Sequence, residues 1–316
     1  MAVATTIVNA KVFDGTRSQD WTSVRFADGL ITECSAASAA REGDEVIDAA
    51  GGTVLPGLID AHVHLVPGAL AQSLTFGVTT VLDMFSKPDL VTGAKEQAGS
   101  RPDVADVRSS GVGATAPGGH PSMMYAPFPT LTAADQAEQF VAERIAEGSD
   151  YLKIISGTGG LWPSLDSDTI KALVTAAHAR GLVVVAHVSS TAGVEEVVSA
   201  GVDVVAHVPA DADLDQALAG RMAEAGIVVG PTLRPRPRHG PPGLGTTRRH
   251  PAHRASPRGG PLKASTTPDP VGAAGAAGLR RTTILATRRP AGPTLRRPNA
   301  PAYTSWPVAL SRSLSA

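Results

Sequence analysis

The sequence predicts an α/β protein: an incomplete TIM-type (β/α) barrel, preceded by a small N-terminal β-layer and followed by an irregular C-terminal tail. Between residues 54 and 233, short runs of apolar and β-branched residues alternate with helical stretches, which is the pattern of a parallel sheet whose strands are joined by helices. Several of these runs end in an ionisable side chain. Barrels of this type carry their active sites at the C-terminal ends of the strands. An abrupt change of composition after residue 233 predicts that the barrel is not completed.

Residues 1–53 are expected to form the β-layer. Thr5–Gly15 reads as a strand that ends in a turn, and Ser23–Cys34 reads as a hairpin around an Asp-Gly pair. Glu45–Gly52 adds a further segment. The barrel is then expected to begin at Val54.

The first barrel strand carries two histidines. Val54–Leu65 is a run of apolar and β-branched residues broken by Pro56-Gly57. Side chains two residues apart in a strand point to the same face, so His62 and His64 project together. Two neutral imidazoles on one face suit a divalent metal such as zinc, although histidines at a strand end also pair with backbone carbonyls.

Three later strands each present one ionisable side chain. Lys153 lies in the apolar run YLKII, and His187 and His207 each lie in an Ala-His-Val segment at the end of a valine-rich run. A buried lysine is costly as a cation, so it is usually neutral, paired or chemically modified. Together with the His-x-His strand, these residues predict one site at the ends of the strands.

The remaining elements follow the same alternation. Helices are expected over 69–76, 133–147, 168–180, 191–200 and 214–225, and strands over 77–84, 104–112 and 227–233. Residues 117–125 lack periodicity and are expected to form a loop.

The bulk properties limit the class of protein. A single cysteine, Cys34, excludes an internal disulfide framework and fits a reducing compartment. The N-terminus lacks the features of a signal peptide and no run is long enough to cross a membrane, so a cytoplasmic location is expected. Residues 1–232 hold 13 basic and 28 acidic residues, whereas residues 233–316 hold 15 basic residues and one acid, Asp269.

The motif PGLIDAHVH, followed by the strand lysine and two AHV strands, resembles the amidohydrolase superfamily. The resemblance covers roughly residues 1–232 and is specific to the two-metal members related to imidazolonepropionase and the Xaa-Pro and Xaa-Arg dipeptidases. It implies two divalent metal ions, with zinc as the expected ion. His62 and His64 would bind one metal, His187 and His207 the second, and carboxylated Lys153 would bridge both. A carbamate supplies the negative charge that two adjacent dications need.

The resemblance also implies a reaction. A metal-dependent amidohydrolase hydrolyses a non-aromatic C–N bond, in an amide or cyclic amide, with a hydroxide that bridges the metals. The expected substrates are small-molecule amides, dipeptides or heterocycles. His120, in a Gly-Gly-His segment, is a candidate substrate-binding residue or an exposed loop residue.

Two other features allow a structural or a functional interpretation. Asp83 at a strand end either orients the metal site or is structural. The glycines in Ser156–Gly160 allow either a close approach to a ligand or a flexible turn.

The sequence departs from the family after Leu233. An eighth strand should carry an aspartate that moves the proton, but the Arg/Pro-rich segment 234–316 offers none, and Asp269 stands between prolines. No catalytic residue can be assigned, and we expect activity to be impaired. Members of the family also complete the β-layer with C-terminal strands, which we expect to be missing.

The basic segment 234–316 has two interpretations. A segment rich in Arg, Pro, Ala and Gly that begins abruptly inside a barrel is typical of a GC-rich gene translated out of frame. The alternative is a disordered basic tail that binds nucleic acid, on a barrel that binds metal or ligand without catalysis. Few aromatic residues interrupt the tail, which makes nucleic acid the weaker interpretation. No membrane partner is expected, and self-association into a homo-oligomer is left open.

Overall fold

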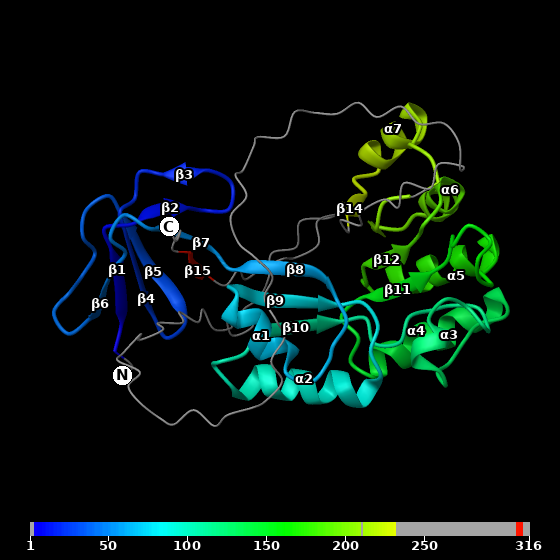
Figure 1. Ribbon diagram of the computed structural model, residues 1–316, viewed down its shortest axis with the longest axis horizontal. Helices are drawn as coiled ribbons and strands as arrows, with labels where there is room; N and C mark the ends of the chain where they lie inside the picture. The colour runs from blue at the N-terminus through cyan, green and yellow to red at the C-terminus, as the bar shows by residue number, and fades with distance from the viewer. Residues whose placement is uncertain (1–2, 210, 232–307, 312–316) are drawn as a thin grey trace, which may run out of the picture. The chain divides into compact units, whose positions relative to one another are not determined.

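The computed structural model describes residues 3–209, 211–231 and 308–311. Figure 1 shows an N-terminal group of short strands and a longer series of strands and helices that runs in chain order from β8 to β14. The two groups correspond in sequence to the predicted β-layer and the predicted barrel strands, except at their boundary. Val54–Pro56, predicted to begin the first barrel strand, instead lies in a strand of the layer, and the barrel strand begins at Leu58 after the Pro56-Gly57 break.

Two four-stranded sheets form the N-terminal layer. In the order β5-β4-β1-β6, strand β4 is antiparallel to β1 and β6 is parallel to it. The other sheet has the order β15-β7-β2-β3. Ile7, Val12 and Val24 are buried in the core of the layer. The strands are β1 Thr5–Val8, β2 Lys11–Phe13, β3 Ser18–Gln19, β4 Ser23–Ala27, β5 Leu30–Ser35, β6 Glu45–Asp48, β7 Thr53–Pro56 and β15 Val308–Ser311.

Strand β15 corrects the expectation that C-terminal strands are missing from this layer. Val308–Ser311 pairs antiparallel with all four residues of β7. Because β2 occupies only one edge of β7, the other edge would leave backbone N–H and C=O groups unpaired without β15. The composition of the whole 234–316 segment could not reveal so short a strand. The other predictions for this segment concern Asp269, the irregular tail and its two interpretations. They lie outside the described residues.

Seven parallel strands then follow in sequence order. β8 (Leu58–Val63), β9 (Val78–Asp83) and β10 (Asp106–Ser109) form one sheet. The other sheet has the order β11-β12-β13-β14 and consists of β11 Leu152–Ile155, β12 Val184–His187, β13 Val204–Ala206 and β14 Val228–Gly230.

A single parallel bridge between Ala114 and Ile154 joins the two sheets. The Ala114 N–H donates to the carbonyl of Lys153 at 2.7 Å, and the Ile155 N–H donates to the carbonyl of Ala114 at 2.8 Å. Within the described residues the strands do not close into a ring, because β8 and β14 are each the last strand of their sheet.

Helices cover the outer side of these strands (Figure 1). The larger core packs strand residues such as Leu152 and Val205 against Ile170 and Leu173 of α5. A smaller core packs β9 and β10 against the first two helices. The helices are α1 Ala69–Thr75, α2 Pro88–Ser100, α3 Ser122–Tyr125, the 3₁₀ turn η1 Ala134–Gln136, α4 Ala137–Ala146, α5 Ser167–His178, α6 Thr191–Ala200 and α7 Gln216–Glu224.

The sequence pattern missed two helices. α2 has proline at its first turn and Asp89 near its positive end, but only Val91 and Ala94 are buried, so its apolar stripe is narrow. α3 is a single turn inside the segment expected to be a loop. No helix in residues 3–209 or 211–231 is both long and apolar enough to span a bilayer.

Candidate active site

The structure brings His62 and His64 to the same side of the end of β8. Their ring centroids lie 5.6 Å apart, as expected from the alternation of side chains along a strand. The His62 N–H donates to Asp60 Oδ1 at 3.1 Å. The Nδ1 atom of His64 lies 3.4 Å from the carbonyl oxygen of Phe85. A carbonyl at Nδ1 favours the tautomer whose Nε2 is free to bind a metal.

His187 and His207 reach the same place from β12 and from the residue after β13. The rings of His62 and His207 lie 4.6 Å apart, and those of His187 and His207 lie 4.5 Å apart. His207 has a φ of 76°, a conformation that non-glycine residues rarely adopt. Its N–H donates to the Gly230 carbonyl at 2.9 Å, which helps to hold this conformation. The four predicted imidazoles therefore converge from three strands.

Lys153 is buried beneath these histidines on β11. Only 2% of the residue is exposed, and its Nζ lies 3.8 Å from Met84 Sδ. No carboxylate in the described part of the chain forms an ion pair with it. Burial lowers the pKa of Lys153 from 10.5 to about 7. A substantial fraction of the amine is therefore neutral near pH 7.

Burial also keeps two of the histidines neutral. It lowers the pKa of His62 to about 3, with smaller contributions from Lys153, His207 and His64. Burial lowers the pKa of His187 far below 6.5, and His207 and Lys153 add to the effect. A neutral imidazole keeps the lone pair that a metal needs.

The predicted substrate residue His120 lies beside this group. Its ring stacks on that of His187, with centroids 5.3 Å apart, and meets Trp162 edge-on at 6.0 Å. On the other side, Tyr125 of α3 lies 6.1 Å from His64. Trp162 and Tyr125 were not predicted. We call the whole series the ring crescent; in spatial order it contains Tyr125, His64, His62, His207, His187, His120 and Trp162.

Asp83 forms hydrogen bonds that link the end of β8, which carries His62 and His64, to the ends of β9 and β10. Its fully buried carboxylate accepts hydrogen bonds from the Leu65 N–H at 3.1 Å, from Ser86 Oγ at 2.8 Å and from Ser109 Oγ at 2.5 Å. Its carbonyl accepts a hydrogen bond from the Tyr151 hydroxyl at 2.6 Å. Asp83 therefore holds the backbone immediately after His64. This role is structural, and it would also help to orient His64 if that residue binds a metal.

Gly157 has a structural explanation. A Cβ atom on Gly157 would lie 2.7 Å from the Cα of Gly193 in α6. The carbonyl of Gly157 accepts hydrogen bonds from the Ser189 N–H at 3.0 Å and from Ser190 Oγ at 3.1 Å. Close packing of two backbones thus requires this glycine, without any ligand.

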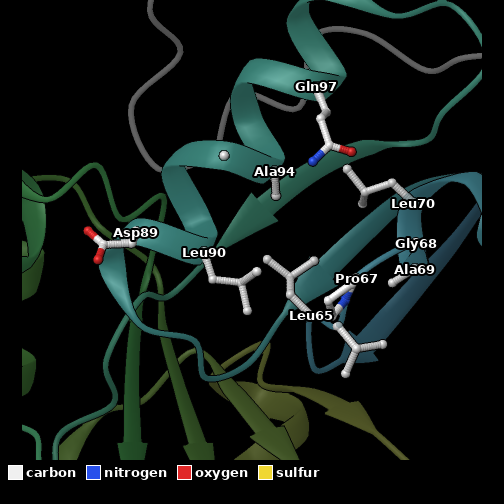
Figure 2. Close-up of a pocket in the computed structure, with 11 residues that line it drawn as sticks. Leu65, Pro67, Gly68, Ala69, Leu70, Asp89, Leu90, Ala94 and Gln97 are labelled. Carbon is white, nitrogen blue, oxygen red and sulfur yellow. The ribbon is translucent and has the colours of Figure 1, made fainter.

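One cavity lies beside the site and not within it. It has a volume of ≈ 100 Å³ and lies between the segment 65–70 and α2 (Figure 2). Leu65 and Leu90 face one another there, and none of the candidate metal ligands lines it. Its small volume and the lack of candidate ligands among its lining residues give it no part in the predicted chemistry.

Comparison with known proteins identifies the family. Residues 53–239 match the profile of the amidohydrolase family. The chain belongs to the amidohydrolase family. Curated relatives of this amidohydrolase include an uncharacterized protein of Mycobacterium tuberculosis, which is 31% identical over 241 residues, or 70% of this chain and 58% of the relative. An adenine deaminase of Bacillus velezensis is 38% identical over 99 residues, which cover 29% of this chain and 16% of that enzyme.

Solved structures share the fold of this amidohydrolase. A putative prolidase from Bifidobacterium longum is 27% identical, with a TM-score of 0.57 over 70% of this chain and 57% of that one. A Xaa-Pro dipeptidase with bound methionine is 22% identical, with a TM-score of 0.60 over 72% and 66% of the two chains. The amidohydrolase described here thus spans less than two thirds of the length of these relatives.

The donor set fits a metal site in its chemistry. Two buried imidazoles are held neutral, and the buried lysine has no anionic partner among the described residues. In the same residues, no group of three or more His, Cys, Asp or Glu side chains stands in an arrangement that could already hold one metal ion. The ligand roles of the five residues therefore remain predictions.

Proposed function

We propose that this amidohydrolase is a metal-dependent hydrolase that cleaves the C–N bond of an amide or cyclic amide. The observation that carries the proposal is the convergence of His62, His187 and His207 from three strands above a buried lysine with no anionic partner. A structural role would not require four imidazoles and a lysine in one place.

The proposed roles follow the positions of the side chains. His62 and His64 would hold one divalent ion and His187 and His207 the other, zinc being one of the ions that suit imidazole ligands. When bound, such ions polarise a carbonyl and activate water near neutral pH. His120 would contact the substrate, a role that its stacking on His187 supports.

Lys153 is proposed to bridge the ions as a carbamate. Its neutral amine would attack the carbon of carbon dioxide, forming an N–C bond and releasing one proton to solvent. The product is an anionic oxygen donor in place of a cation. The lowered pKa of Lys153 supports this step because only the neutral amine has the lone pair that attacks.

We further propose that β8 to β14 are seven strands of a (β/α) barrel, with β1 to β7 and β15 as a separate layer. The aspartate of an eighth strand has no assigned position. Loss of a general base commonly costs about 10² to 10⁴ in rate, so we expect the chain as written to turn over slowly. The single cysteine supports a cytoplasmic location as part of the same proposal.

Prolonged incubation of zinc-loaded protein with a panel of N-acyl amino acids, dipeptides and cyclic amides tests the hydrolase function. We expect slow release of amine that stops after chelator treatment and in His187→Ala. The matched control is His178→Ala, because His178 is exposed and pairs with Asp203 on the helix side. Hydrolysis that is unchanged by chelator and by His187→Ala would overturn the proposal. Bound metal without any hydrolysis would favour the non-catalytic alternative.

A further inference from the structure

The ring crescent ends in two aromatic side chains, Trp162 and Tyr125, that are not among the candidate metal ligands. Trp162 lies next to His120 and Tyr125 lies next to His64, so aromatic surfaces flank the candidate ligands at both ends. Tyr125 also stacks on buried Phe85 at 4.6 Å, and Phe85 meets Phe128 edge-on at 5.2 Å. The Tyr125 end of the crescent is therefore backed by packed aromatic rings.

Exposed apolar side chains lie next in sequence to Tyr125 and Trp162. Met123 and Met124 of α3 are 69% and 63% exposed, and Leu161, next to Trp162, is 78% exposed. Large apolar side chains are seldom left in solvent in clusters unless they contact a ligand or a partner. Methionine in particular adapts its shape to apolar ligands.

The segments that follow β8 to β13 carry almost no positive charge. Residues 110–133, which follow β10 and include His120 and Tyr125, contain no Lys, Arg, Asp or Glu. Neither do residues 64–77 after β8 or 188–190 after β12. Residues 156–166, after β11, hold one acid, and 207–215, after β13, are acidic. Lys87, after β9, is the one basic residue in these segments of the described chain.

This charge pattern disfavours a substrate with a free carboxylate. Recognition of a carboxylate normally uses an arginine or a lysine, and burial of an unpaired anion is strongly unfavourable. A dipeptide or an acyl amino acid carries such a group. A neutral amide with an aromatic or branched apolar substituent would instead find apolar surface next to the candidate metal ligands.

We propose that this site selects uncharged amides that carry a bulky apolar or aromatic group, which packs against Tyr125 or Trp162 at one end of the crescent. The inference rests on the proposed metal-dependent function and deepens it by naming the substrate class. Tyr125 and Trp162 are specificity-determining residues in this assignment, and they take no part in bond cleavage.

Three hydroxamates with one metal-binding group and different tails test the assignment. Acetohydroxamate, benzohydroxamate and the hydroxamate of succinic acid are titrated into zinc-loaded full-length protein by calorimetry. Burial of a phenyl ring predicts that benzohydroxamate binds on the order of tenfold more tightly than acetohydroxamate. The succinate derivative should bind no better than acetohydroxamate.

Variants locate the preference within the crescent. At least one of Trp162→Ala and Tyr125→Ala should reduce the ratio of benzohydroxamate to acetohydroxamate affinity several-fold while leaving acetohydroxamate binding unchanged. Phe76→Ala is the matched control, because Phe76 is an aromatic residue with 75% exposure at the end of α1 and should not alter the ratio. Trp162→Leu keeps apolar volume in case the alanine variant does not fold.

The outcomes separate the inference from the function on which it rests. If none of the hydroxamates binds zinc-loaded protein, the metal site itself fails. Equal binding of the acetyl and phenyl compounds, or tightest binding of the succinate compound, overturns the substrate class but leaves the metal site in place. An aromatic preference that survives both Trp162→Ala and Tyr125→Ala overturns the assigned location.

Discussion

Replacement of Asp83 should destabilise the protein more than replacement of any exposed acid in the same region. The Asp83 side chain is fully buried and accepts three hydrogen bonds, one from a backbone N–H and two from serine hydroxyls. Hydrogen bonds to a charged group contribute about 1.5–3 kcal/mol each, and a donor left buried without a partner costs about 1–3 kcal/mol. The two serines can rotate toward other acceptors, whereas the Leu65 N–H cannot. We therefore expect Asp83→Ala to lower the free energy of unfolding by about 3–6 kcal/mol.

Urea denaturation followed by circular dichroism measures this loss. Asp83→Asn keeps the shape but replaces one acceptor oxygen with a donor, so it should cost less than Asp83→Ala, about 1–3 kcal/mol. Asp89→Ala is the control, since Asp89 is an exposed acid in the first turn of α2 and should cost less than about 1 kcal/mol. A loss below about 1 kcal/mol in Asp83→Ala would show that the hydrogen bonds of this carboxylate do not stabilise the strand ends.

Two further perturbations follow from the same structure. The pKa of Lys153 is about 7 in the folded protein and 10.5 in the unfolded chain, so the unfolded chain binds one more proton between these pH values. The free energy of unfolding of the metal-free protein should therefore rise with pH in this window, by up to about 1.4 kcal/mol per pH unit. Lys153→Met should remove this rise. If urea denaturation at pH 7, 8 and 9 gave the same pH dependence of the unfolding free energy for both proteins, burial of Lys153 would not be its cause. Gly157→Ala combines a φ of +61° with a Cβ placed 2.7 Å from the Gly193 backbone, and should cost about 2–4 kcal/mol. Gly160→Ala has a similar φ of +81° but no atom within 4 Å, so it should cost only about 1–2 kcal/mol, and equal losses in thermal denaturation would count against the close approach.

The sequence predicted those features that depend on local periodicity. Alternation along β8 placed His62 and His64 together, and the valine-rich runs placed His187 and His207 at strand ends. The helix α6 matches its predicted range of 191–200 because an apolar stripe and a serine cap mark it in the sequence. The family assignment also followed from the order of these motifs.

Features that depend on contacts between distant residues could not be predicted. The need for Gly157 arises from Gly193 in another element, and the partners of Asp83 lie on three different segments. Trp162 and Tyr125 were missed because only the folded loops bring their rings beside His120 and His64. Strand β15 was missed because four residues leave little trace in the composition of a long basic segment.

The central claim is that residues at the ends of the strands form a two-metal site. Its most direct test is the metal content of purified, zinc-loaded protein, measured by inductively coupled plasma mass spectrometry after removal of free ions. The account predicts two zinc ions per chain in the wild type and in His178→Ala, and a loss of one or both in His187→Ala and in His62→Ala. A wild-type chain without bound zinc, or equal zinc content in all four proteins, would contradict it.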